Sequence, residues 1–271
     1  MGFFGNISNT LAMMKSSANV LKKDKELVLF PLLAAASIAV FLALMWSFGA
    51  IGLDKAEGEE QPILVYVVII FVSNFIIVFF NSALVSAALE RLRGGDPNVY
   101  SGFSHAVKHI HHILIWSIIV TIVAILIAAL RGNRRGIAGQ IFGSLLQAGW
   151  TMMTFFVVPI IVSENLSPFA AIKKSTSLFK STWGNQITAN FGFGIFQIVA
   201  LLISAAIGWF FGLIDNTFGL VIGVLFAAVS VTIIYTLEGI YKAALYEFAV
   251  GEKPLEFEKQ QLKTAYSVYK A

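Results

Sequence analysis

The chain contains no cysteine and little charge. Of its 271 residues, 58% are hydrophobic and 13% are Asp, Glu, Lys or Arg, whereas a soluble domain is about half apolar and a quarter charged. The missing cysteines exclude disulfides, thiol catalysis and cysteine-ligated metal sites. The net charge of +4 is too small to indicate nucleic-acid binding. The composition therefore predicts an integral membrane protein.

The sequence contains long runs of apolar residues without charge. Runs of about 18 or more such residues are long enough to cross a bilayer as a helix. The predicted spans are 27–52, 62–89, 113–130, 137–163, 187–213 and 219–246. We therefore expect a single all-α membrane domain over 1–271, in which an N-terminal helix (1–26) and a C-terminal cytoplasmic tail (247–271) flank a polytopic bundle (27–246).

The N-terminal segment predicts an amphipathic helix at the membrane interface. Its apolar face consists of Phe3, Phe4, Ile7, Leu11, Met14, Ala18 and Leu21. Its polar face consists of Asn6, Asn9, Lys15, Ser16, Asn19 and Lys22.

The ends of the even-numbered spans resemble one another. AALERLRGGDP (87–97) aligns with the end of AALYEFAVGEKP (243–254), so that Glu90 matches Glu247 and Gly94 matches Gly251. SENLSP, with Glu164, is a looser third copy. The amphipathic stretch SGFSHAVKHIHHILIW likewise parallels SPFAAIKKSTSLFKSTW. The expected unit is an in-plane helix, a span out and a span back, repeated three times.

Basic residues of the three in-plane helices are expected to contact lipid headgroups. They are Lys15, Lys22, Lys23, His105, Lys108, His109, His112, Lys173, Lys174 and Lys180.

All four histidines fall in SHAVKHIHHIL, which opens a second interpretation. On one helix His105, His109 and His112 share a face at a spacing that metal ligands use. Glu90 and Glu164 are the only plausible carboxylates to complete such a site, and Lys108 beside the rings opposes a cation. We therefore predict no metal, no cofactor and no enzymatic activity. A pH response of lipid contact stays open, because histidine titrates near neutral pH.

Several polar residues have an expected structural role. Glu90 should pair with Arg91 or Arg93, Glu164 with Lys173 or Lys174, and Glu238 with Lys242, because a charge at membrane depth is costly unless it is paired. Asn74, Asn81 and Gln147 are predicted to lie inside the bundle and hydrogen-bond between helices, with a polar passage as the alternative. Glycine pairs spaced by four, such as Gly208 with Gly212 and Gly219 with Gly223, favour close helix approach.

Orientation follows from the basic residues of the loops. Of the 19 Lys and Arg residues, only Lys55, Arg131, Arg134 and Arg135 fall on the side opposite the termini. Both termini are therefore predicted to be cytoplasmic. The RGNRRG turn (131–136) is expected to meet lipid phosphates or the acidic loop that carries Asp54, Glu57, Glu59 and Glu60.

The stretches KDKELVLFPLL, FFNSALVSAALERLRGGDP and WTMMTFFVVPIIVSENLSPFAAIKKSTSLFKSTWGNQ resemble an uncharacterised family of bacterial and archaeal six-span membrane proteins. That family is distantly similar to the membrane domain of some glycerophosphodiester phosphodiesterases. The catalytic barrel of those enzymes has no counterpart in the chain. The resemblance implies a prokaryotic inner-membrane location and a partner-binding or lipid-contacting bundle.

The expected function is therefore a non-enzymatic membrane scaffold or accessory subunit. Its partners would be membrane lipids and either a second copy or another membrane protein. The alternative is a transporter or flippase-like passage for a lipid or small amphiphile.

Overall fold

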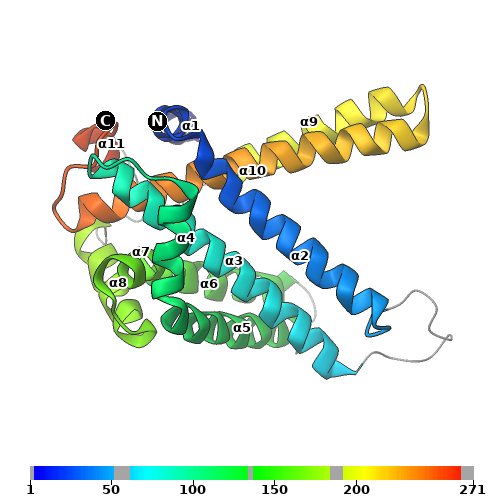
Figure 1. Cartoon of the computed structure of the whole chain (residues 1–271), viewed down its shortest axis with the longest axis horizontal. Helices are drawn as coiled ribbons and strands as arrows, with labels where there is room; N and C mark the ends of the chain where they lie inside the picture. The colour runs from blue at the N-terminus through cyan, green and yellow to red at the C-terminus, as the bar shows by residue number, and fades with distance from the viewer. Residues whose placement is uncertain (1–2, 52–61, 134–136, 184–191, 264–271) are drawn as a thin grey trace. The chain divides into compact units, whose positions relative to one another are not determined.

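The computed structural model describes residues 3–51, 62–133, 137–183 and 192–263, and the regular structure of these residues is helical (Figure 1). In chain order the elements are α1 (Phe3–Lys23), the 3₁₀ helix η1 (Lys25–Val28), α2 (Leu29–Ser47), α3 (Ile63–Leu92), α4 (Val99–Lys108), α5 (Ile110–Asn133), α6 (Ile137–Thr154), α7 (Val157–Glu164), α8 (Pro168–Trp183), α9 (Gly192–Gly212), α10 (Asn216–Ala249) and α11 (Lys259–Lys263).

Six of these helical stretches are long and apolar enough to cross a membrane, which confirms the predicted fold class. They are Lys25–Ser47, Ile63–Leu92, Ile110–Arg131, Gly139–Glu164, Phe193–Gly212 and Asn216–Ala249. The order of elements also follows the expected unit, because α1, α4 and α8 each precede two of the spans.

The chain divides into two compact units, each assembled from separate segments. Unit 1 contains Met1–Leu29, Ala87–Val99 and Lys180–Ala271. Unit 2 contains Phe30–Ser86 and Tyr100–Phe179. The helix α3 therefore contributes its last residues to unit 1 and the rest to unit 2. We describe each unit by itself.

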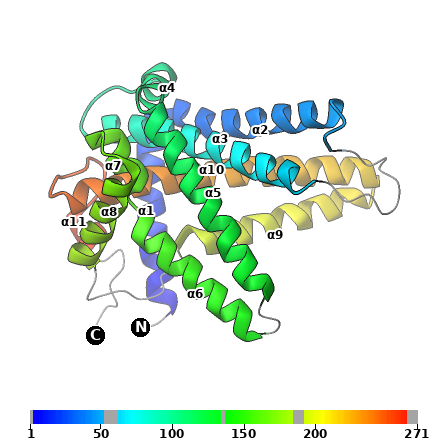
Figure 2. The same cartoon turned by 90° about the horizontal axis from the view of Figure 1, so that it is seen from below.

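In unit 1, glycines hold α9 and α10 side by side as a hairpin (Figures 1 and 2). A Cβ on Gly219 would lie 2.4 Å from the Cα of Gly212 and 2.5 Å from the carbonyl oxygen of Gly208. Backbones approach this closely only where neither helix has a side chain, which is the role expected for these glycines. Asp215 begins α10 by accepting a hydrogen bond from the Phe218 amide, at 2.8 Å, as helix-capping aspartates do.

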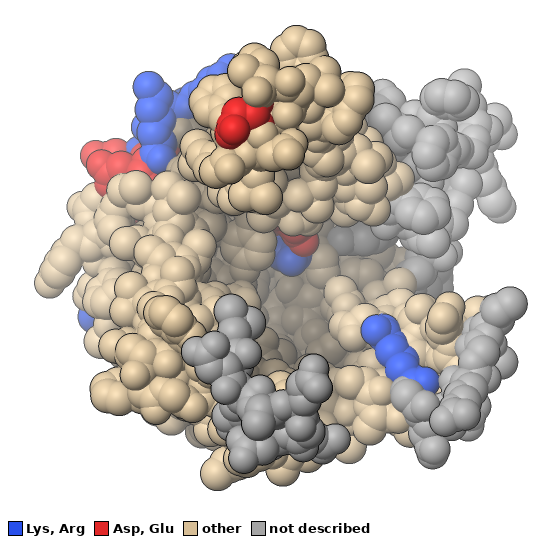
Figure 3. Space-filling view, turned by 90° about the vertical axis from the view of Figure 1, so that its right-hand side faces the viewer, with Lys and Arg blue, Asp and Glu red and all other residues tan. Residues whose placement is uncertain are grey.

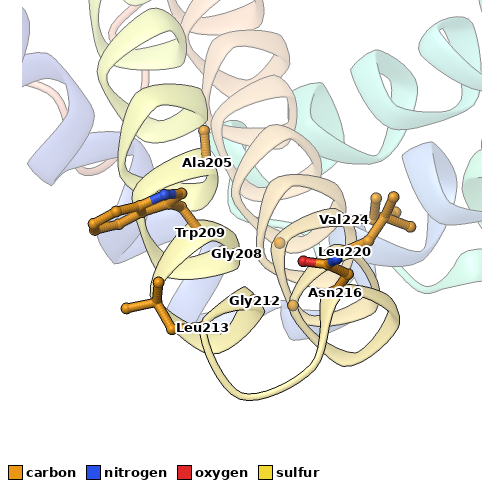
Figure 4. Close-up of a pocket in the computed structure, with 10 residues that line it drawn as sticks. Ala205, Gly208, Trp209, Gly212, Leu213, Asn216, Leu220 and Val224 are labelled. Carbon is orange, nitrogen blue, oxygen red and sulfur yellow. The ribbon is translucent and has the colours of Figure 1, made fainter.

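The glycines also leave a shallow groove of about 410 Å³ on the surface of the hairpin (Figure 4). Trp209 of α9 and Leu213, just after this helix, lie on one side of it, and Asn216, Leu220 and Val224 of α10 lie on the other.

The face of α1 that packs on α10 is not the apolar face predicted from the sequence. Met13, Ser17 and Val20 are buried, whereas Leu11 of the predicted apolar face is 50% exposed. Small and medium side chains allow close packing, and Met14, Ala18 and Leu21 of the predicted apolar face are half-buried beside them. Ser16, which we expected on the polar face, is also buried.

In unit 2, α5 and α6 form a second hairpin (Figure 2). Trp116 stacks on Trp150 with ring centroids 5.8 Å apart. At the other end of the hairpin the Arg131 guanidinium donates to the carbonyl oxygen of Gly143, at 3.3 Å. Arg134, Arg135 and the acidic loop expected to meet them lie outside the described residues.

The fourth span is interrupted between α6 and α7. Pro159 lacks an N–H and its ring conflicts with the carbonyl four residues earlier, so a helix breaks there. Two side chains of α8 form hydrogen bonds with backbone groups at this interruption. Ser175 Oγ accepts a hydrogen bond from the Phe156 amide at 3.0 Å. The Thr176 hydroxyl shares its one hydrogen between the Ile172 carbonyl at 2.9 Å and the Met153 carbonyl at 3.3 Å.

Replacing Gly219 with alanine tests the α9–α10 contact. The new Cβ would overlap backbone atoms, so the helices must separate, and overpacking of this kind costs about 1–3 kcal/mol. We expect a lower Tm of the detergent-solubilised protein by circular dichroism. Gly212→Ala is the matched control, because a Cβ there meets nothing within 4 Å. Equal Tm values for the two variants would contradict this packing.

Replacing Ser175 with alanine tests the interrupted span. The buried amide of Phe156 would lose its acceptor, and an unsatisfied buried donor costs about 1–3 kcal/mol. We expect faster amide hydrogen exchange at the break and a lower Tm. Ser177→Ala, at an exposed position of the same helix, should change neither quantity, and a similar effect of both variants would exclude this role of Ser175.

Candidate functional site

The helices α3 and α10 end in the same way, as the sequence repeat predicts. Gly94 and Gly251 both adopt the left-handed conformation, with φ of 90° and 94°. The amide after each glycine donates to the carbonyl oxygen of Glu90 or Glu247, at 2.9 Å in both. Glycine is favoured at such helix ends because a Cβ would be strained. The two copies therefore share the backbone hydrogen bonds of their helix ends as well as their sequence.

The third copy ends differently from the expected alignment. The helix α7 stops at Asn165, which is left-handed with φ of 52°. Pro168 follows three residues later, as a proline follows Gly94 and Gly251. In this register Ile161, and not Glu164, occupies the position of Glu90 and Glu247. The sequence comparison aligned the three copies on their glutamates. The structure aligns them on the left-handed residue that ends each helix.

A buried carboxylate joins the end of α1 to the end of α3 in unit 1. Arg91 donates from two nitrogens to the two carboxylate oxygens of Asp24, whose side chain is 5% exposed. Arg91 also binds the exposed Asp96, at 2.6 Å. Arginine suits this position because its planar group binds a carboxylate through two parallel hydrogen bonds.

A second buried carboxylate joins α3 to α10. Glu247 is 2% exposed, and its Oε1 accepts hydrogen bonds from Nη2 of Arg93 at 2.7 Å and from Nε at 3.1 Å. The hydrogen bond to Glu247 raises the pKa of Arg93 above its ordinary value, so the guanidinium stays protonated. The expectation that Glu90 takes these arginines is wrong, since Arg91 and Arg93 bind Asp24, Asp96 and Glu247.

Two contacts hold the segment after α10 against the ends of α1 and α3. The Leu255 amide donates to the Leu92 carbonyl at 3.0 Å. Lys23 binds Glu256 at 2.5 Å. We call these contacts and the two arginine pairs the charged junction: it joins α1, the end of α3 and the chain beyond α10. Lys23, expected at the lipid headgroups, is thus held in an ion pair.

Small side chains face the protein on the other two in-plane helices as well. In unit 2, α4 buries Gly102 and Ala106, and α8 buries Ala171, Ser175 and Phe179. Their outward positions combine large apolar and basic side chains. The exposed basic residues of the expected headgroup set are Lys15, Lys22, Lys23, His105, Lys108, Lys173 and Lys180.

The histidine stretch is divided between two helices. The helix α4 ends at Lys108, α5 begins at Ile110, and His109 forms the turn, with its Nδ1 2.8 Å from the carbonyl oxygen of His105. The single helical face that would bring three rings to one metal is therefore interrupted. Within the described residues no group of three or more His, Asp or Glu is placed to hold a metal ion.

The remaining polar residues fall into two groups. Lys174 binds Glu164, and Lys242 lies 2.8 Å from Glu238 one helical turn away. Asn74 donates to Thr121 Oγ1 at 3.1 Å, which joins α3 to α5.

The other two amides expected in the interior, Asn81 and Gln147, differ in their exposure. Asn81 is half-buried. Gln147 is exposed, so its predicted interior position is wrong. Gly139 and Gly143 lie on the buried face of α6, and Gln147 lies to one side of it.

A family model described as a family of unknown function, DUF6159, matches residues 62–254. The chain belongs to this family. The matched region of this DUF6159 member runs from α3 to Pro254, so it includes Arg91, Arg93 and Glu247, while Asp24 lies outside it. No curated protein and no solved structure matches the chain.

Removing Arg93 tests the charged junction. Arg93→Ala leaves Glu247 buried without this partner, and an unsatisfied buried polar group costs about 1–3 kcal/mol. We expect a lower Tm, and Glu247→Gln in the same chain should restore part of it because the amide carries no charge. Asp96→Asn is the control, since Asp96 is 97% exposed and exposed ion pairs contribute about 0–1 kcal/mol. A double-mutant cycle without coupling would contradict the pairing.

Proposed function

We propose that this DUF6159 member is a non-enzymatic scaffold or accessory subunit of a prokaryotic inner membrane. It contacts anionic lipid through α1, α4 and α8, and it associates with a second copy or with another membrane protein. Both termini face the cytoplasm in this proposal.

The observation that carries the proposal is the division of the in-plane helices into three faces. One face packs inward, with small residues on α4 and both small and aromatic residues on α8, a basic edge is exposed, and large apolar side chains are exposed beside it. Phe103 and Val107 of α4 are 41% and 43% exposed, and Phe169 of α8 is 71% exposed. An apolar face beside basic residues suits the boundary between acyl chains and anionic headgroups.

Association is supported by the surface of the spans. Figure 3 shows a face on which Lys, Arg, Asp and Glu are sparse. Many large apolar side chains of the candidate spans are exposed, including Val40, Trp209 and Leu220. Lipid or another apolar helix is the natural cover for such a surface.

The cytoplasmic location of the termini is supported by the distribution of basic residues. The distant similarity to the membrane domain of glycerophosphodiester phosphodiesterases is part of this proposal only as a parallel for a lipid-contacting bundle. No hydrolase activity is carried over from it.

One observation favours the alternative, a passage for a lipid or small amphiphile. Transporters often have interrupted spans whose free backbone groups bind the substrate. Here the fourth span is interrupted, but Ser175 and Thr176 already occupy the Phe156 amide and the Met153 carbonyl. Asn74 is also bonded to Thr121. These contacts support a structural role for the polar groups and make the scaffold the better proposal.

Spin labels test the proposal, because the chain has no cysteine and each introduced cysteine is unique. Labels at Leu11, Val107 and Phe169 in phosphatidylglycerol vesicles should collide more with oxygen than with a water-soluble nickel chelate. A label at the buried Ala106 is the control and should be shielded from both. Greater access of the nickel chelate to the first three would place the helices in water and contradict lipid contact.

Extraction of the same vesicles and of native membranes in mild detergent tests the association. Native mass spectrometry should detect an oligomer or a co-purifying membrane protein, with anionic lipid retained. A monomer without retained lipid would refute the scaffold.

A further inference from the structure

A cavity of about 280 Å³ lies beyond the end of α10, within unit 1. Four apolar side chains contribute to its lining: Phe248 from α10, Leu262 from α11, and Pro254 and Phe257 between them. Cavities that bind drug-sized ligands measure about 300–1,000 Å³. This one therefore has room for a small organic group and not for a whole lipid.

The walls of the cavity are anchored in the protein. Phe248 packs against Trp183 with ring centroids 6.2 Å apart. Trp183 is 1% exposed, and its indole N–H donates to the carbonyl of Leu262 at 3.3 Å. Leu262 is itself fully buried. The wall is thus built by packed side chains and a hydrogen bond from a distant part of the chain.

The segment beside the cavity is held in a strained conformation. Glu256 has φ of 68°, in the left-handed region that residues with a Cβ rarely adopt. Such strain persists only where surrounding contacts impose it. Here the Lys23–Glu256 pair and the bond from the Leu255 amide to the Leu92 carbonyl impose it. The next residue, Phe257, lines the cavity.

Two lysines of the lining contrast with the cations of the charged junction. Lys253 and Lys259 are exposed, and neither forms an ion pair with another residue that the structure describes. Glu252 is on the same lining. The local charge therefore favours an anion of one or two negative charges.

We propose that this cavity binds a phosphate ester, with the phosphate between Lys253 and Lys259 and the organic part against Phe248 and Phe257. Lysine ammonium groups bind phosphate as mobile point charges. The cavity lies at the C-terminal end of the apolar helix α10, which contributes Phe248 and ends at Ala249, so a span made by this helix would bring the cavity near the lipid headgroups. The ester is either the headgroup of a phospholipid or a soluble molecule. The two lysines of this site lie outside the in-plane helices, although Trp183 of α8 supports its wall.

Titration of the full-length protein in neutral detergent tests the site. The probes are phosphatidylglycerol with short acyl chains, followed by native mass spectrometry, and glycerol 3-phosphate, followed by equilibrium dialysis. We expect one saturable site for at least one probe. Lys253→Glu with Lys259→Glu should weaken it at least tenfold, and Phe257→Ala should weaken it severalfold. Lys253→Arg with Lys259→Arg should retain it.

A matched charge change on α8 separates this site from general lipid contact. Lys173→Glu with Lys180→Glu should leave the saturable site unchanged and reduce only the non-saturable lipid adducts. Binding of both probes identifies the phosphate ester itself as the ligand, whereas binding of the lipid alone identifies the headgroup with its acyl chains. Binding of neither probe, or binding that survives charge reversal at Lys253 and Lys259, overturns the proposal.

Discussion

Pairing of two buried carboxylates is the interaction on which unit 1 depends. Asp24 and Glu247 are almost inaccessible to solvent, and an ionised carboxylate in such a place is stable only with a hydrogen-bonded cation. Their cations, Arg91 and Arg93, stand two residues apart at the end of α3. One short segment therefore determines where the end of α1 and the end of α10 lie. The bond between Leu255 and Leu92 then brings the chain after α10 to the same place.

Small residues are the second recurring element. Glycines bring α9 and α10 into backbone contact, and Gly102, Ala106, Ala171 and Ser175 give α4 and α8 their buried faces. In a membrane, lipid solvates large apolar side chains as well as protein does, so packing favours close approach of small ones. Many large apolar residues of the spans remain exposed, although others, such as Phe30, Phe156 and Trp183, are fully buried.

Most of the fold could be predicted from the sequence, since the length and apolar character of a span are properties of one segment. The same holds for Glu238 and Lys242, which are one helical turn apart. The partners of Arg91 and Arg93 could not be predicted, because Asp24 and Glu247 lie 67 and 154 residues away. Gln147 was misplaced because hydropathy reports membrane depth and not the side of the helix that faces the protein. The interruption of the span predicted over 137–163 was not predicted, although Pro159 could have indicated it, and only the structure identifies Ser175 as the acceptor for the Phe156 amide.

The length of α10 has a consequence for the surroundings of the charged junction. Its 34 residues extend about 50 Å at 1.5 Å per residue, whereas the hydrocarbon layer is about 30 Å thick. A helix of this length, unless steeply tilted, projects beyond the acyl chains at one or both ends. Glu247 lies in its last turn, so its pair with Arg93 is at one end of this helix and not in the middle of a span. Salt that screens charge on a membrane surface would therefore reach the exposed rim of the junction while its buried carboxylates remain shielded.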